Sequence, residues 1–178
     1  AISDQAVCDQ VYETLTVTKD DGTVAPCLAK SWKMSDDSLE YTFQLEEGVK
    51  FHNGEVMTAD DVVYSFEQYI ANPAKNNFVS LIDKVEMVDA NTVKVTLNKV
   101  TPLFLVYINE LPILNKKFVE EHNGNISDVA CGTGPYKLTS IDLATSAMLE
   151  RNDDYRLAPA AIEKGELRYV GDRATASV

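Results

Sequence analysis

The sequence predicts an α+β fold built from hairpins and short helices, rather than an alternating βαβ arrangement. Two pairs of strand-like segments, 84–88 with 92–97 and 136–141 with 146–151, are each joined by a short turn. A segment that follows Thr58 has the apolar spacing of a helix. These patterns place hairpins and helices in one mixed architecture.

The N-terminal part combines a helical pattern with a turn. Apolar residues recur at every fourth position across residues 5–15, which predicts a short helix capped by Ser3 or Asp4. Residues 19–22 end in Asp-Gly and predict a turn. Residues 28–32 are mixed and show no clear period.

The middle of the chain has clear strand and helix signals. Residues 40–45 alternate apolar and polar side chains, as a half-buried strand does, and Asn-Gly at 53–54 is a turn dipeptide. Thr58 precedes acidic residues that suit the first turn of a helix. This helix is expected to end at Asn-Pro, residues 72–73.

The C-terminal part adds two helices, a sharp bend and a last strand. Helices are expected from residue 103 and over 115–122, and a final strand over 166–170. The Gly-Thr-Gly-Pro sequence at 132–135 lacks the pattern of a phosphate-binding loop, and Pro135 has no amide to offer a phosphate. We interpret it as backbone that bends sharply.

Composition and charge exclude some classes of function. The 178 residues are 45% hydrophobic, and 28 acidic against 16 basic residues give a formal net charge of −12. Such a surface repels phosphate backbones, so we expect no nucleic-acid partner. No stretch approaches the roughly 18–20 uninterrupted apolar residues of a membrane span. The first residues also lack the layout of a signal peptide.

Cys8, Cys27 and Cys131 form an odd and widely spaced set. They allow at most one intramolecular disulfide, and their small or apolar neighbours favour buried thiols. No group of Cys and His has the spacing of zinc ligands. We therefore expect no metal site and no cofactor.

The chain shows no catalytic motif, which favours a binding module over an enzyme. His52 and His122 are its two histidines, and neither lies in a metalloprotease pattern such as HExxH. The nucleophile pattern GxSxG is also absent. A hydrolase whose Ser–His or Cys–His pair meets only in space stays open as a rival.

Several segments, in order along the chain, resemble the family 5 solute-binding proteins, the peptide and nickel class of ABC importers. Their residues fill a core, form turns or start a helix, so they identify a scaffold, and His52 among them is interpreted as structural. The resembling segments are 11–15, 28–32, 35–45, 48–54, 58–66, 132–138 and 149–155.

The resemblance implies a two-lobed, type II periplasmic-binding-protein fold that encloses its ligand between the lobes. It implies the solute-binding component of an ABC importer, which captures a peptide or similar small solute and delivers it to a membrane permease. It implies a monomer outside the cytoplasm, in the periplasm or as a cell-surface lipoprotein, that is not an enzyme. A sensor or receptor with the same fold, and a binder of nickel or metal chelates, stay open as alternatives.

The resemblance also implies a domain organisation. Residues 1–24 would belong to the first lobe, 25–131 would form an additional subdomain of that lobe, and 132–178 would return to the first lobe. Family members are much longer, so the resemblance implies a fragment that lacks the second lobe and with it most of the groups that select the ligand.

Candidate ligand contacts on the first lobe follow from the same resemblance. For Tyr12 and Phe78, an ordinary core or surface role is the alternative. The candidate ligand-binding residues are Tyr12, Glu13, Leu15, Phe78, Thr101, Pro102, Gly132, Thr133 and Gly134. Four residues depart from the usual family pattern and leave the ligand class open, among them Arg156 in place of a Trp; the others are Glu46, Cys131 and Asp153.

Overall fold

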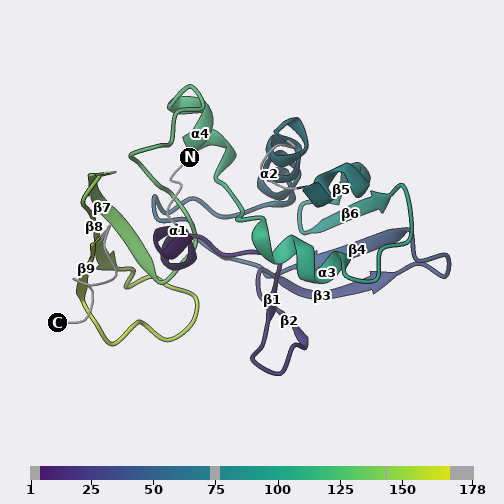
Figure 1. Cartoon of the computed structure of the whole chain (residues 1–178), viewed down its shortest axis with the longest axis horizontal. Helices are drawn as coiled ribbons and strands as arrows, with labels where there is room; N and C mark the ends of the chain where they lie inside the picture. Colours follow the sequence, from purple (N-terminus) through teal and green to yellow (C-terminus); the bar gives the residue numbers. More distant parts are fainter. Residues whose placement is uncertain (1–4, 73–76, 143, 169–178) are drawn as a thin grey trace.

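The computed structural model of the chain describes residues 5–72, 77–142 and 144–168. Within these ranges it contains three antiparallel sheets and several short helices, which confirms the predicted α+β class (Figure 1). A four-stranded sheet lies on one side of the molecule and a three-stranded sheet on the other, with helix α1 between them (Figure 1). The chain thus has two packed units, each with its own core.

The four-stranded sheet carries the larger core. Its strands in spatial order are β3 (Ala29–Met34), β4 (Glu40–Leu45), β6 (Thr92–Leu97) and β5 (Ile82–Asp89), and all neighbours are antiparallel. Tyr41, Phe43 and Leu45 alternate with polar residues along β4 and are buried. The strand predicted at 40–45 and the hairpin predicted over 84–97 are confirmed.

Strand β3 is the one member of this sheet that the sequence does not reveal. It lies at the edge of the sheet and buries only Ala29, while Trp32 is half-buried and the other side chains are exposed. An edge strand with few apolar residues lacks the alternation from which strands are predicted. Its pairing with β4 in three dimensions defines it.

Helix α2 (Ala59–Ala71) packs across β5 and β6. It begins after Thr58 as predicted, where the Thr58 backbone N–H donates to the Asp61 carboxylate at 2.9 Å. Val62 and Phe66 are fully buried on its inner face. The local sequence therefore sets where the helix starts, and its apolar face sets how it packs.

The other helices of the larger unit are short. They are η1 (Asn77–Leu81), α3 (Phe104–Tyr107), η2 (Ile108–Glu110) and α4 (Lys116–Glu121). The helices predicted from residue 103 and over 115–122 are confirmed, although the first is only one turn long before it tightens into η2. No helix in the described ranges combines the length and the apolar character needed to cross a bilayer.

The three-stranded sheet carries the smaller core. Its strands in order are β7 (Tyr136–Asp142), β8 (Ser146–Arg151) and β9 (Lys164–Arg168), all antiparallel. Helix α1 (Gln5–Val11) packs on β7, and Val7 and Val11 share this core with Ala147 and Leu149. The predicted hairpin is confirmed, as is the last strand up to residue 168; residues 169–170 lie outside the described part.

The expectation of one helix over residues 5–15 is wrong at its end. Helix α1 stops at Val11, and Leu15 lies in the larger core instead of on the helix face. The chain leaves helical geometry because another segment meets the helix end, where the Gly134 N–H donates to the Val11 carbonyl oxygen at 2.9 Å. The expected caps, Ser3 and Asp4, lie outside the described residues.

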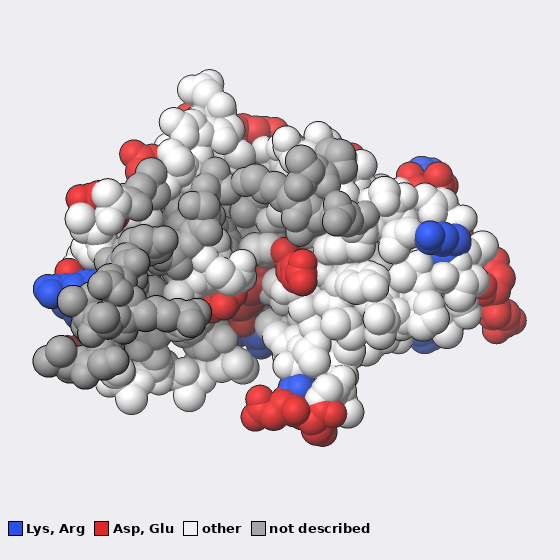
Figure 2. All heavy atoms as spheres, in the orientation of Figure 1, with Lys and Arg blue, Asp and Glu red and all other residues white. Residues whose placement is uncertain are grey.

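A two-stranded hairpin, β1 (Thr16–Thr18) with β2 (Val24–Pro26), projects from the junction of the two units. The turn predicted at residues 19–22 joins its strands, and Gly22 has the positive φ of 81° that such a turn requires. Figure 2 shows acidic side chains and a basic one over this turn at the bottom of the molecule. Charged residues here lie at exposed turns, where water solvates them.

We expect Val95→Ala to lower the free energy of unfolding by about 2–3 kcal/mol, because it leaves a cavity beneath a fully buried position of β6. Val88→Ala is a matched control on neighbouring β5, where the side chain is 59% exposed. It should cost less than about 1 kcal/mol. Urea denaturation measures both, and equal losses would contradict the described burial of the two strands.

Candidate functional site

The Gly-Thr-Gly-Pro segment at 132–135, here called the crossing segment, leads from the larger core to the smaller one and packs against the end of α1. A Cβ atom on Gly132 would lie 2.0 Å from the Val11 carbonyl oxygen, and one on Gly134 would lie 2.6 Å from that of Gln10. Such distances are too short for any side chain. The approach of two backbones therefore requires glycine at both positions.

His52 holds the crossing segment from the side of the larger core. Its backbone N–H donates to the Gly132 carbonyl oxygen at 2.9 Å, its Nε2 lies 3.0 Å from the Gly134 carbonyl oxygen, and its Nδ1 lies 3.4 Å from the Gly132 nitrogen. Because a carbonyl only accepts, Nε2 carries the proton and Nδ1 accepts. Burial lowers the pKa of His52, and the neutral ring is the form that satisfies both contacts.

The Glu13 carboxylate lies at the centre of a buried polar cluster. Thr133 Oγ1 donates to Oε2 of Glu13 at 2.9 Å, and the Tyr155 hydroxyl donates to Oε1 at 3.0 Å. Nη2 of Arg156 donates to the same Oε1 at 2.8 Å and forms an ion pair. A carboxylate taken out of water needs such donors and an opposite charge. With Cys27, these side chains are called the Glu13 cluster.

Cys27 is the last member of the Glu13 cluster, and its thiol is not made more reactive there. Its Sγ lies 3.6 Å from Oε1 of Glu13 and 3.5 Å from Nη2 of Arg156. Burial, and after it the Glu13 charge, raises the pKa of Cys27 to about 11, so the thiol stays protonated at neutral pH. The same two causes raise the pKa of Tyr155. The cluster is thus a set of hydrogen bonds with no nucleophile in it.

The structure gathers five of the nine predicted ligand residues at the crossing segment: Tyr12, Glu13, Gly132, Thr133 and Gly134. The Tyr12 ring is buried in the smaller core, and Thr133 is 1% exposed. Their side chains therefore face protein. Leu15 lies two residues beyond Glu13 and is enclosed in the larger core.

The other three predicted residues, Phe78, Thr101 and Pro102, lie around α3. The Phe78 ring stacks on Tyr107 with ring centroids 5.4 Å apart. Thr101 is buried and Pro102 is exposed. Helix α3 packs against β1, and β1 directly follows the loop that carries Glu13. Ligand contact by any of the nine residues stays a prediction.

Sequence reasoning missed the partners supplied by the segment after β8. Asn152 Nδ2 donates to the Gly134 carbonyl oxygen at 3.1 Å, and Tyr155 and Arg156 both reach Glu13. Glu13 and Arg156 are 143 positions apart, so no local pattern connects them. The one available signal is the charge of Arg156 at a position where the resembling family usually has Trp.

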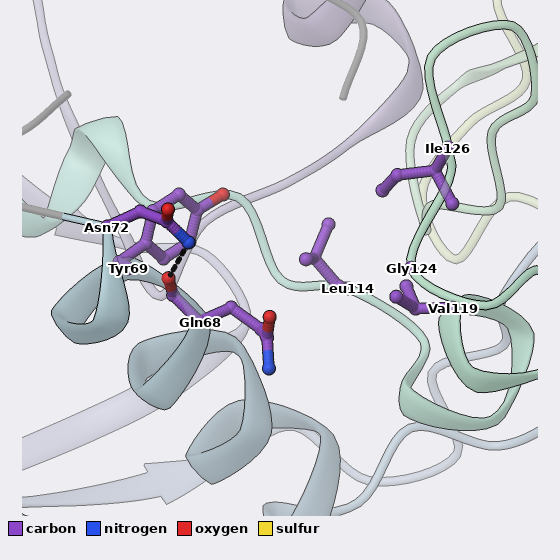
Figure 3. Close-up of a pocket in the computed structure, with 7 residues that line it drawn as sticks. All are labelled: Gln68, Tyr69, Asn72, Leu114, Val119, Gly124 and Ile126. Atoms are coloured by element: carbon purple, nitrogen blue, oxygen red, sulfur yellow. Dashed lines mark hydrogen bonds between the residues drawn. The ribbon is translucent and has the colours of Figure 1, made fainter. Parts of the chain in front are cut away.

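A separate pocket of about 220 Å³ lies between α2 and α4 (Figure 3). Residues of α2 face residues of the α4 region across it, and Asn72 Nδ2 donates to the Gln68 carbonyl oxygen. The lining residues are Gln68, Tyr69, Asn72, Leu114, Val119, Gly124 and Ile126. None of the nine predicted ligand residues belongs to this lining.

The structure also bears on metal and catalytic chemistry. Within the described ranges, no three His, Cys, Asp or Glu side chains are grouped as a metal ion would require. Cys8, Cys27 and Cys131 form no disulfide with one another; Cys131 is buried as expected, whereas Cys8 and Cys27 are half-buried. Among the residues that the structure describes, neither His52 nor His122 has a Ser, Thr or Cys side chain as a hydrogen-bond partner. A histidine-activated nucleophile is therefore not assembled in this part of the chain.

Comparison with known proteins gives a consistent result. A sequence model described as bacterial extracellular solute-binding proteins, family 5, middle part, matches residues 23–178. Heme-binding protein A of Haemophilus influenzae is 29% identical over 96% of the chain and 36% of its own length. Oligopeptide-binding protein OppA of Bacillus subtilis is 33% identical over 84% of the chain and 32% of its own length.

Solved structures show the same relationship. NikZ from Campylobacter jejuni, in complex with Ni(L-His), superposes with a TM-score of 0.88 at 31% sequence identity, over 99% of the chain and 37% of NikZ. The chain thus spans about a third of the length of the relatives that it matches. The type II periplasmic-binding-protein fold expected from the sequence is confirmed for this third.

We expect Gly132→Ala to lower the free energy of unfolding by about 3 kcal/mol, because its Cβ would overlap the Val11 carbonyl oxygen. Gly165→Ala is the matched control: nothing lies within 4 Å of the added Cβ in β9. Its effect should stay within about 1 kcal/mol of wild type. Urea denaturation compares the two, and an unchanged stability of Gly132→Ala would contradict the backbone approach.

We expect His52 to make stability depend on pH. Since folding lowers its pKa, its contribution is present above the ordinary pKa of 6.5 and is lost as the pH falls below that value. The melting temperature should therefore drop more steeply below pH 6.5 in the wild type than in His52→Gln. Thermal melts in a pH series measure this, with His122→Gln as the control for the second histidine. Parallel curves for wild type and His52→Gln would refute it.

Proposed function

The chain belongs to the bacterial extracellular solute-binding proteins of family 5, and on this premise we propose that it forms part of the solute-binding component of an ABC importer. The component captures a peptide or similar small solute and delivers it to a membrane permease. The observation that carries the proposal is the family match over residues 23–178, together with relatives whose names state binding of heme, nickel and oligopeptides.

Lobe closure supplies the mechanism. A solute enclosed between two lobes loses its contact with water on all sides, so burial and hydrogen bonds stabilise the closed form without a chemical step. The Glu13 cluster and the His52 contacts support this function, because they stiffen the crossing segment on which one wall of the site would rest.

The first-lobe wall is formed by the nine predicted residues, in two roles. Residues with open surface, such as Pro102 and the half-buried Phe78, touch the solute directly. Enclosed residues, such as Leu15 and Thr133, do not touch the solute and instead hold in place the backbone that faces the solute. The wall comprises Tyr12, Glu13, Leu15, Phe78, Thr101, Pro102, Gly132, Thr133 and Gly134.

The proposal includes a domain organisation and a location. Residues 1–24 and 132–178 belong to the first lobe, and 25–131 form its additional subdomain; the smaller core, which joins α1 to the three-stranded sheet, supports this division, while Leu15 enters the larger core. The protein acts as a monomer outside the cytoplasm, in the periplasm or as a cell-surface lipoprotein. It has no enzymatic activity and no nucleic-acid partner.

A metal chelate is the second candidate solute, because NikZ, which was solved with Ni(L-His), superposes closely on the chain. Use of the same fold as a sensor for signalling is the remaining alternative. A permease gene beside the gene for this chain favours import, and a kinase gene in its place favours sensing.

Binding can be tested by thermal melts with pooled tripeptides, Ni(L-His) and heme as probes. A protein that carries this chain and extends over the full length of the relatives should gain several degrees, about 5 °C, with one probe at roughly a hundredfold excess over its Kd. The 178-residue chain alone should shift by less than about 1 °C, because it spans only about a third of the length of its relatives and a solute enclosed by two lobes would keep only part of its contacts. Tight peptide binding to the chain alone, or no shift of the longer protein with any probe, would contradict the proposal.

A further inference from the structure

Arg156 has more hydrogen-bond donors than the protein uses. Its Nη2 group is engaged with Glu13 at 2.8 Å and with Cys27 at 3.5 Å. Nε is buried and has no partner among the described residues. Nη1 makes no hydrogen bond to the described residues either, and the side chain as a whole is 20% exposed. Within the described part of the chain, three of the five N–H groups of this guanidinium therefore have no partner.

Glu13, by contrast, is enclosed and already paired within the protein. Its two carboxylate oxygens accept from Thr133, Tyr155 and Arg156, and its side chain is 8% exposed. The ion pair also cancels its charge. An ammonium group of a solute would have to displace Arg156 to reach this carboxylate, which would leave a buried charge without its partner.

The position of Arg156 suits contact with a solute held at the crossing segment. The side chain is 20% exposed, so it is held by the protein yet open on one side. Its partner Glu13 comes from the loop after α1, and Glu13 in turn accepts a hydrogen bond from Thr133 of the crossing segment. Glu13 and Cys27 hold the guanidinium through Nη2. A guanidinium fixed in this way loses little conformational entropy when it binds an acceptor.

We propose that Arg156 binds a carboxylate of the solute through the N–H groups of its Nη1, with Glu13, Tyr155 and Cys27 as positioning residues; this rests on the proposed function and narrows it to solutes with an acidic group. A guanidinium matches a carboxylate in shape and charge, and hydrogen bonds between two charged groups are the stronger kind. The Trp usual at this position in the resembling family offers one neutral donor. An Arg in place of this Trp therefore favours a negatively charged group of the solute at the site.

Three tripeptide pools of the same length test the inference on the longer protein. The first pool has free C-terminal carboxylates and no acidic side chains, the second has the same sequences as C-terminal amides, and the third has amides with one Glu. Calorimetry should show that wild type binds the first or the third pool at least roughly tenfold more tightly than the second. This preference is the measured quantity.

Variants separate the binding role of Arg156 from a structural one. Arg156→Gln should remove the preference, and Glu13→Gln with Arg156→Gln should remove it as well while sparing the protein an unpaired buried carboxylate. Arg156→Lys keeps the charge but lacks the planar donor set, so it should retain only part of the preference. Arg168→Gln is the matched control, because Arg168 is exposed and pairs with Glu166.

Each outcome decides one question. A preference for carboxylate pools that both Gln variants lose, and that Arg168→Gln keeps, supports the inference. Equal binding of all pools, or a preference that the double variant retains, overturns it and leaves the proposed function standing. Binding of none of the pools by a folded wild type overturns the peptide form of the proposed function together with the inference.

Discussion

Backbone packing between the crossing segment and the end of α1 underlies the arrangement of the whole chain. Gly132 and Gly134 approach Val11 and Gln10 so closely that no Cβ fits between them. This contact joins the smaller core, on α1 and the three-stranded sheet, to the larger core beneath the four-stranded sheet. Because protein interiors are close-packed and yield little, one such contact constrains the relative position of both sheets.

Polar contacts secure the same junction. His52 contacts the backbone of the crossing segment with both ring nitrogens, and Glu13 receives donors from two segments distant in sequence. Burying the Glu13 charge is costly, and the adjacent Arg156 offsets that cost only while every partner is in place. The junction is therefore cooperative. Removing Arg156, for example, would leave the buried Glu13 carboxylate without an opposite charge. Such stiffness suits the wall proposed above, which would have to keep one shape while a solute is enclosed.

Elements with a strong hydrophobic period are predicted well. The strand at 40–45, the helix after Thr58 and both hairpins follow from patterns within a few residues, and the structure confirms them. Strand β3 escapes prediction because only Ala29 of its side chains is buried. Helix α1 ends early because a distant segment stops it at Val11. Local patterns are thus reliable where burial is periodic and fail where another part of the chain intervenes.

The order of residues alone yields the α+β class, the periodic elements and the family, since each depends on short segments read in sequence. It also points to the Gly-Thr-Gly-Pro bend, and to Tyr12, Glu13 and the glycines as a candidate site. Only folding shows that Glu13 meets Arg156, which lies 143 positions away, and that Nε of this arginine is buried without a partner among the described residues. The partner of a buried charge is the oppositely charged residue that folding brings next to it. The residues beside Glu13 in the sequence contain no information about that partner.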